Sequence, residues 1–244
     1  MIRIAAVGDL HAGPDSAGTI RPRFDGIEER ADVLLLAGDL TRRGTPEEGR
    51  ILADELSELD VPVVAVLGNH DYHSDRQDEL RSLLEGAGVV VLEGESTTLE
   101  LGAGRLGVAG TKGFGGGFAG ACATPFGEPQ IKSFVGHTEA LAASLEGALR
   151  KVEDADVRVA LLHFAPVEAT LSGERLEIYP FLGSYLLGEA IDRAGADLAF
   201  HGHAHRGSEK GATAAGIHVR NVAEHVIGHA YNVYTVDERR AASA

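Results

Sequence analysis

Five short clusters of residues that can bind metal ions recur along the chain. Each contains Asp, Asn or His, whose oxygen and nitrogen atoms are common metal ligands. In chain order the clusters are Asp9-Leu10-His11, Gly38-Asp39, Gly68-Asn69-His70-Asp71, His163 and Gly202-His203-Ala204-His205. Together they supply enough ligands for two metal ions.

The spacing within the clusters favours shared sites. Asp9 and His11 are two residues apart, and on an extended backbone such side chains point to the same side, so that both can bind one ion. His203 and His205 repeat this spacing. Asp39 follows a glycine, and a lone carboxylate there can bridge two ions with its two oxygens. A set that mixes imidazole nitrogen with Asp and Asn oxygen suits Mn²⁺, Fe, Zn²⁺ or Ni²⁺ better than Ca²⁺.

Each cluster follows a short apolar run, which is typical of a buried strand. These runs cover residues 4–7, 33–37, 61–67, 157–162 and 198–200. In open α/β sheets, ligands bind in the crevice outside the carboxyl ends of the strands. We therefore expect the five clusters to meet in one site.

The order of the apolar and amphipathic segments predicts an α/β fold with two sheets. Predicted helices over 46–59 and 75–85 alternate with the first strands, which indicates neighbouring parallel strands. From residue 89 to 110 the pattern changes to short strands with turn signals, which predicts a β meander that begins a second sheet. The remaining elements are predicted helices over 137–152 and 185–194 and strands over 217–222 and 231–236. We expect one domain over residues 1–237 and a polar tail over 238–244.

Composition limits the classes of partner. The 244 residues carry a formal net charge of −15, which disfavours nonspecific binding of nucleic acid or an anionic membrane, but leaves room for a small phosphorylated substrate. One cysteine, Cys122, excludes an internal disulfide and suits a reducing compartment. The first residues run directly into the first strand. We expect a cytoplasmic protein, and a homo-oligomer is left open.

The ordered series Asp-x-His, Gly-Asp, Gly-Asn-His-Asp, His and Gly-His-x-His resembles the calcineurin-like metallophosphoesterase superfamily. The resemblance implies a four-layer α/β/β/α sandwich, in which two packed mixed β-sheets are flanked by helices. It implies that a first metal ion is held by Asp9, His11, Asp39 and His205. It implies that a second is held by Asp39, Asn69, His163 and His203. It also implies that His70 is the catalytic acid and that Asp71 orients the His70 ring.

The same resemblance implies a dinuclear phosphoesterase that hydrolyses a small phosphodiester or phosphomonoester by attack of a hydroxide bridging the two metals. Among the branches of the superfamily, the compact length is most like stand-alone bacterial phosphohydrolases, including the cyclic-nucleotide phosphodiesterase type. A nucleotide pyrophosphatase is an alternative. A binding or scaffold protein that kept the fold and lost the chemistry is a rival from another class, although every expected ligand position is filled.

Two further features of the sequence, an arginine and a group of aromatic residues, lie outside the metal clusters. Arg43 stands where the protein-phosphatase branch has an arginine that contacts phosphate, and we treat it, together with Asn69, as a candidate for substrate binding. Eight of the 13 Phe and Tyr residues lie between residues 112 and 185. They wall the substrate pocket, form a subunit contact or pack two long loops, 111–136 and 164–183, onto the core.

The histidines outside the clusters are interpreted as surface or hydrogen-bonded imidazoles. They are His73, His137, His201, His218, His225 and His229. Of these, His73 and His201 are close enough in sequence to the clusters to touch the pocket.

Overall fold

The computed structural model describes residues 1–237, so the predicted tail over 238–244 lies outside the described residues. The first sheet has the strand order β13-β1-β2-β3-β4, in which β1 to β4 are parallel and β13 is antiparallel to β1. Its strands are β1 (Ile2–Val7), β2 (Val33–Ala37), β3 (Val63–Val66), β4 (Val90–Val91) and β13 (Asn232–Val236). Three parallel strands therefore end at one edge with a ligand cluster after each.

The second sheet has the order β11-β12-β10-β9-β6-β5, with a parallel centre and antiparallel pairs at both edges. Its strands are β5 (Glu95–Leu101), β6 (Gly104–Thr111), β9 (Val157–Leu162), β10 (Leu198–His201), β11 (Lys210–Ala212) and β12 (His218–Asn221). A separate two-stranded sheet is made by β7 (Gly117–Phe118) and β8 (Ala121–Cys122).

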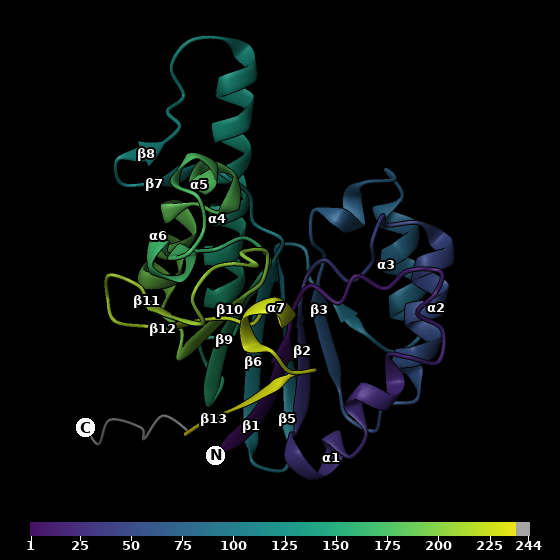
Figure 1. Ribbon diagram of the computed structural model, residues 1–244. Coiled ribbons are helices and arrows are strands. Elements are labelled where there is room, and N and C mark those ends of the chain that lie inside the picture. The colour runs from purple at the N-terminus through teal and green to yellow at the C-terminus, as the bar shows by residue number, and fades with distance from the viewer. Residues whose placement is uncertain (238–244) are drawn as a thin grey trace, which may run out of the picture.

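Helices cover the outer faces of the two large sheets (Figure 1). The first sheet carries α1 (Ile27–Arg30), α2 (Pro46–Ser57) and α3 (Gln77–Gly86). The second carries α4 (Pro129–Lys151) and α6 (Tyr185–Ala194). Shorter helices and 3₁₀ turns are α5 (Tyr179–Leu182), α7 (Glu224–Ile227), η1 (Arg21–Phe24), η2 (His70–Tyr72), η3 (Glu168–Leu171) and η4 (Leu176–Ile178). The predicted four-layer α/β/β/α sandwich is confirmed.

Strand β2 shows why the layers form. Its five residues are all buried, and their side chains alternate between the two faces of the sheet. Leu34 and Leu36 pack under the helices, whereas Val33, Leu35 and Ala37 face the second sheet. A strand covered on both faces is continuously apolar, which is the pattern expected for the centre of a parallel sheet.

The loop after β2 is held at its far end by the start of α2. Thr45 and Glu48 form a capping box, because the Thr45 hydroxyl accepts from the Glu48 amide and the Glu48 carboxylate accepts from the Thr45 amide. Glu48 also accepts from the amide of Arg43, at 2.9 Å. The backbone that carries Arg42 and Arg43 is therefore fixed between β2 and α2.

The structure corrects two predictions about the middle of the chain. The second sheet does not begin near residue 89, because β4 pairs in parallel with β3 and completes the first sheet. The connection through α3 brings the chain back so that β4 runs in the same direction as β3. Of the predicted meander, only β5 and β6 form an antiparallel pair. Helix α4 begins at Pro129 and not near residue 137, since proline is favoured in the first helical turn.

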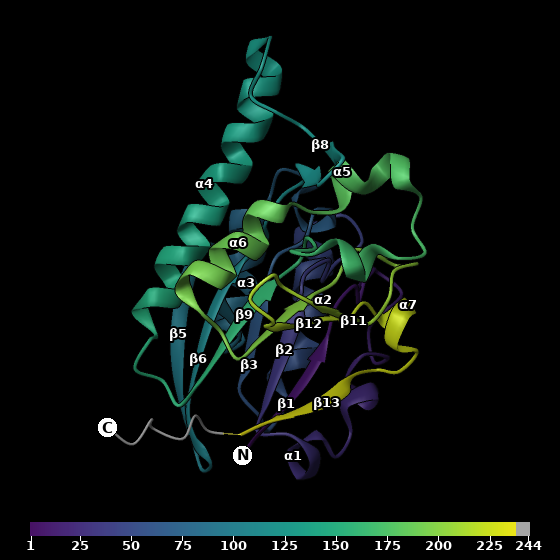
Figure 2. The same cartoon turned by 90° about the vertical axis from the view of Figure 1, so that its left-hand side faces the viewer.

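The early start of α4 has a visible consequence. Its N-terminal turns extend beyond the sheets (Figures 1 and 2), and α5 packs against the β7–β8 hairpin. Within residues 1–237, none of the helices has both the length and the apolar character needed to cross a membrane. The single domain over 1–237 stays a prediction.

Candidate metal centre

The sequence clusters lie in the loops that follow five parallel strands. Asp9 follows β1, Asp39 follows β2, and Asn69 follows β3, while the second sheet contributes His163 after β9 and the His203–His205 pair after β10. Backbone hydrogen bonds join neighbouring loops: the amide of Asp9 donates to Gly38 O at 2.9 Å and that of His11 to Asp39 O at 3.0 Å. Strands distant in sequence thus deliver their polar ends to one place.

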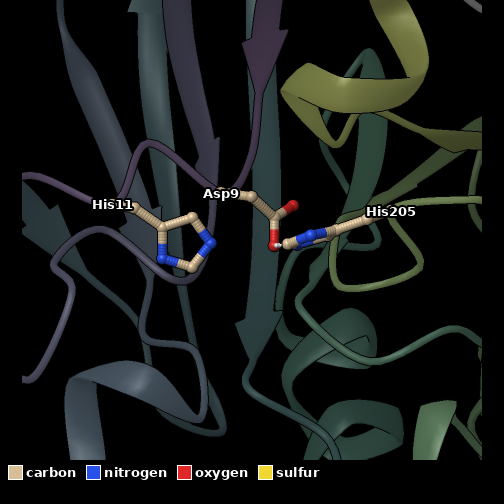
Figure 3. Close-up of side chains that lie close together, drawn as sticks. All are labelled: Asp9, His11 and His205. Carbon is tan, nitrogen blue, oxygen red and sulfur yellow. Dashed lines mark hydrogen bonds and ion pairs between the residues drawn. The ribbon is translucent and has the colours of Figure 1, made fainter.

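Asp9, His11 and His205 form the first cluster of ligand-type atoms (Figure 3). One atom from each lies within 4.8 Å of the others. The Asp9 carboxylate stands between the two imidazole rings and is 2.9 Å from Nε2 of His205. The same carboxylate accepts from the backbone amide of His203 at 3.0 Å. Asp9 is almost fully buried, so its charge needs these partners or a cation.

Asp39, His163 and His203 form the second cluster. Nε2 of His163 lies 3.3 Å from Oδ1 of Asp39 and 2.9 Å from Oδ1 of Asn69. Nδ1 of His163 contacts the backbone oxygen of Ala37 at 2.9 Å. A proton on Nδ1 satisfies that carbonyl and leaves the Nε2 lone pair facing Asp39, which is the tautomer a metal ligand needs.

A third cluster, His11, Asp39 and His70, joins the first two. Oδ2 of Asp39 lies 4.0 Å from Nε2 of His11 and 3.9 Å from Nε2 of His70, while Oδ1 faces His163. The backbone amide of His70 donates to Oδ1 at 2.8 Å. The Asp39 carboxylate therefore lies between the two halves of the site.

The backbone of the site is strained in a pattern that the sequence does not reveal. Among residues 1–237, five non-glycine residues have a positive φ, and four of them belong to the clusters: Asp9 (63°), His11 (48°), Asp39 (49°) and His203 (67°). Such conformations cost about 1–3 kcal/mol each and persist where the surroundings enforce them. Here they turn the chain sharply at strand ends, so that side chains from both sheets converge.

Two glycines of the clusters, Gly68 and Gly202, lie so close to a neighbouring aspartate that no side chain fits there. A Cβ at Gly68 would collide with the backbone nitrogen and the Oδ1 of Asp39, and a Cβ at Gly202 would collide with Oδ2 of Asp9. Any other residue at these positions would push a carboxylate out of place. The glycines in these motifs thus make room for the ligand-type side chains of neighbouring loops.

Electrostatics fit a cationic occupant. Burial raises the pKa of Asp9, partly offset by its hydrogen bond to His205. Burial lowers the pKa of His203 to about 3 and that of His163 well below its ordinary value, so both rings are neutral and their lone pairs are free to bind. The site therefore combines buried carboxylates with neutral imidazoles and has no thiolate, a donor set that suits divalent transition metals.

Asp71 and His70 are adjacent in sequence but act on different partners. The buried Asp71 carboxylate accepts from the amides of Leu40, Thr41 and Gly68 and from the Thr41 hydroxyl, at 2.6–3.0 Å. Nδ1 of His70 instead contacts the backbone oxygen of Arg42 at 2.9 Å. Burial and the nearby Asp39 raise the pKa of Asp71 to about 7. Asp71 thus ties the β2 loop to the β3 loop, and Arg42 is the residue that orients the His70 ring.

Arg43, His201 and His225 lie outside the three clusters of ligand-type atoms. The Arg43 side chain is exposed and Arg42 lines the cavity beside Asp9, so a phosphate contact of Arg43 stays a prediction. His201 is buried behind the clusters and bonds Gly202 O and the Thr170 hydroxyl. His225 stacks on His205 with ring centroids 4.6 Å apart. Sequence reasoning missed His225, since nothing in its neighbourhood resembles a metal motif.

Two cavities open beside the clusters. One, of about 390 Å³, shares Asp9 and His11 with the metal clusters and is otherwise lined by Leu10, Arg42, Glu224, His225 and Gly228. The other, of about 450 Å³, shares Asn69 and His203 and is otherwise lined by Phe114, Gly115, Phe134, Phe164, Ile178, Phe181 and Leu182. We call them the polar cavity and the aromatic cavity.

A two-sheet sandwich with Asp, Asn and His converging at its strand ends is a metal-binding α/β fold. The family model of the calcineurin-like phosphoesterases matches residues 2–207, a span that includes all five clusters. The chain belongs to this family.

Two curated relatives match shorter stretches. A probable cyclic nucleotide phosphodiesterase of Synechococcus is 35% identical over 105 residues, covering 38% of this chain and 41% of the relative. A glycerophosphodiester phosphodiesterase of Enterobacter lignolyticus is 31% identical over 75 residues, covering 31% of this chain and 26% of the relative. The matches thus span less than half of either relative.

Solved structures show the same fold. The phosphopantetheinyl hydrolase of Mycobacterium tuberculosis superposes with a TM-score of 0.71 over 98% of this chain and 97% of its own, at 16% identity. A protein of Thermus thermophilus gives 0.57 over 90% and 88%, at 18% identity. At such identities the likeness concerns the fold alone.

Proposed function

We propose that the protein is a dinuclear metal-dependent hydrolase that cleaves a small phosphodiester or phosphomonoester. The position of Asp39 carries the proposal. Its Oδ1 lies 3.3 Å from Nε2 of His163, and its Oδ2 lies 4.0 Å from Nε2 of His11. One carboxylate therefore faces nitrogens of both clusters, as two ions acting on one phosphate require. Membership in the calcineurin-like phosphoesterase family supports the same reaction.

The residues predicted from the sequence fit two divalent ions. The first ion would be held by Asp9, His11, Asp39 and His205. The second would be held by Asp39, Asn69, His163 and His203. When bound, Mn, Fe, Zn or Ni ions would supply an activated hydroxide for attack on phosphorus and would neutralise the phosphate oxygens. Two divalent ions exceed the charge of Asp9 and Asp39 by two, so an acidic protein can still present a positive site to phosphate.

His70 is the proposed general acid. A proton on Nδ1 donates to the Arg42 carbonyl and leaves Nε2 facing Asp39, 3.9 Å from its Oδ2. The side chain is 46% exposed, so a leaving group and solvent can both reach it. A second proton on Nε2 would pass to the leaving oxygen, a step worth roughly 10²- to 10⁴-fold. Asp71 would contribute indirectly, because it holds the Arg42 loop against the loop of His70.

Diester substrates are favoured over monoesters. Both curated relatives are named as phosphodiesterases, and two cavities flank the centre, one for each ester arm. The net charge of −15 supports a small phosphorylated substrate over nucleic acid or a membrane. We propose a cytoplasmic location, since the single cysteine suits a reducing compartment.

Turnover of two chromogenic compounds tests the proposal. Protein loaded with Mn²⁺ should hydrolyse bis-p-nitrophenyl phosphate faster than p-nitrophenyl phosphate, and a chelator should stop both reactions. Asn69→Ala removes an oxygen of the second cluster and should lower kcat/KM at least about 10²-fold. Gln130→Ala, which removes an exposed amide in the first turn of α4, is the control and should leave the rate unchanged.

The outcome separates the alternatives. Cleavage of nucleoside diphosphate compounds but not of simple diesters would indicate a nucleotide pyrophosphatase. Two bound metal ions, measured by elemental analysis, with no turnover of any of these compounds would contradict the hydrolase and favour a binding protein.

A further inference from the structure

The aromatic cavity is continuous with the metal centre. Asn69 and His203 line the cavity and also belong to the second cluster. The ring of Phe164 lies against the ring of His203, with centroids 4.3 Å apart. A phosphate group at the second cluster would therefore have one ester arm directed along Phe164.

Four of the nine residues that line the aromatic cavity are phenylalanines. Phe114 lies 5.0 Å from Phe134 and 5.9 Å from Phe164, and Phe134 lies 6.4 Å from Phe181, all between ring centroids. The rings meet at angles of 45–79°, so they offer both faces and edges to a guest. Phe164 is buried at the base, whereas Phe181 is 61% exposed. The exposed Phe181 ring therefore presents apolar surface to water next to the metal centre, and a bound apolar group would cover it.

Lys112 fixes the base of this wall. Its carbonyl oxygen accepts from the amides of His163 and Phe164, at 3.1 and 3.0 Å. Its Nζ lies 5.0 and 5.1 Å from the ring centroids of Phe114 and Phe164 and donates to Gly113 O at 3.1 Å. The aromatic wall and a residue of the second cluster are thus held by one lysine, so the cavity is formed before a ligand arrives.

The polar cavity differs in chemistry and in its position at the site. It shares Asp9 and His11 with the first cluster, and its other charged walls are Arg42 and Glu224. An apolar group placed there would leave these side chains without their water. The two cavities therefore select different chemical groups on the two sides of one phosphate.

The geometry points to an asymmetric phosphodiester as the substrate class, with a planar aromatic arm in the aromatic cavity and a hydroxylated or otherwise polar arm in the polar cavity. This inference rests on the proposed function. The aromatic arm carries few hydrogen-bonding groups, because Asn69 and His203 are the polar side chains among the residues that line that cavity. Phe114, Phe134 and Phe181 are then specificity-determining residues supplied by the segments 111–136 and 164–183.

Binding of phosphonates to the Mn²⁺-loaded protein tests this inference without turnover. Calorimetric titrations compare inorganic phosphate, methylphosphonate, hexylphosphonate, phenylphosphonate and 1-naphthylphosphonate. Burying one aromatic ring should make phenylphosphonate bind about 10- to 100-fold more tightly than methylphosphonate. Hexylphosphonate has the same number of carbons as phenylphosphonate and should bind more weakly, because the walls suit a planar ring.

Two exposed phenylalanines supply a matched pair of variants. Phe181→Ala should reduce the preference for phenyl over methyl to about threefold or less and leave the affinity for phosphate unchanged. Phe126→Ala should change neither quantity, since Phe126 is 86% exposed and does not line the cavity. Phe134→Ala, from the cavity wall, serves as a second variant and should act like Phe181→Ala.

The possible results separate this inference from the proposed function. Equal affinities for methyl- and phenylphosphonate, with phosphate bound and diesters hydrolysed, would overturn the aromatic arm and leave the hydrolase standing. A preference for phenyl that survives both Phe181→Ala and Phe134→Ala would overturn the assignment to this cavity. Absence of both hydrolysis and phosphate binding would overturn the two proposals together.

Discussion

The loops after β1, β2 and β3 differ sharply from the segments 111–136 and 164–183. The three loops carry polar ligand-type side chains and are joined by backbone and carboxylate hydrogen bonds. Those after β1 and β2 also contain residues with positive φ, such as Asp9 and Asp39. The two longer segments carry aromatic side chains, two of which, Phe126 and Phe181, are exposed. Under the two proposals, this chain separates reaction from recognition: hydrogen-bonded loops bring the ligand-type atoms together, and the longer segments surround the place where the substrate's arm would lie.

His70→Ala is the substitution with the largest expected effect on the reaction half of this comparison. If His70 donates a proton, kcat should fall roughly 10²- to 10⁴-fold while both metal ions remain bound. The loss should be greater for a phenyl ester than for a p-nitrophenyl ester, because a poor leaving group needs the proton more. Steady-state kinetics and elemental analysis check these expectations.

His73→Ala provides the control, since His73 is exposed three residues further along the chain. His70 also belongs to a cluster with His11 and Asp39, so the metal content of His70→Ala must be measured as well as its activity. Loss of an ion from His70→Ala would identify His70 as a metal ligand and would remove it from the role of acid.

Gly68→Ala tests whether the hydrogen-bonded loops depend on close approach. The added Cβ would collide with Asp39, displacing a carboxylate that both clusters share, so activity should fall about 10- to 100-fold. The free energy of unfolding should fall by about 1–3 kcal/mol. Kinetics and chemical denaturation measure the two effects.

Gly86→Ala is the matched control. A Cβ at Gly86, the last residue of α3, meets nothing within 4 Å. The free energy of unfolding of Gly86→Ala should therefore differ from that of the wild type by about 0.5 kcal/mol or less. Equal effects of the two substitutions would show that the contact between Gly68 and Asp39 has no special role.

Sequence reasoning was most successful where a motif and its strand are contiguous. The Gly-Asp and Gly-Asn-His-Asp clusters directly follow apolar runs, so their place at strand ends was predictable, as was the convergence of Asp39, His163 and His203. The partner of the His70 ring was not, because the Arg42 carbonyl is set by the path of a loop. His225 was missed for the same reason: it reaches His205 only through the fold of both sheets.

The aromatic segments were predictable only in composition. The sequence left three roles open for the phenylalanines between residues 112 and 185, and the structure assigns Phe114, Phe134, Phe164 and Phe181 to one cavity wall. Such a wall is built from residues up to 67 positions apart, as the difference between 181 and 114 shows, and no local pattern encodes their meeting.

His201 connects the loop after β10 to the segment 164–183, and its substitution has the smallest expected effect. Its buried ring bonds Gly202 O, in the loop after β10, and the Thr170 hydroxyl, in the segment 164–183. Burial lowers the pKa of His201 from 6.5 to about 4. Well above pH 6.5 the ring is neutral in both the folded and the unfolded protein. As the pH falls from about 6.5 towards 4, the unfolded chain takes up a proton that the folded protein resists, so stability declines.

The size of this decline can be measured against a variant that lacks the ring. Between pH 7.5 and pH 5, His201 should remove about 2 kcal/mol from the free energy of unfolding. His201→Asn should therefore show a shallower decline than the wild type in metal-free urea titrations, whereas His229→Asn, which changes an exposed histidine, should follow the wild type. Identical declines in all three proteins would mean that His201, between the loop after β10 and the segment 164–183, does not sense acid. The acid sensitivity of the fold would then have to originate in the buried histidines of the metal centre itself.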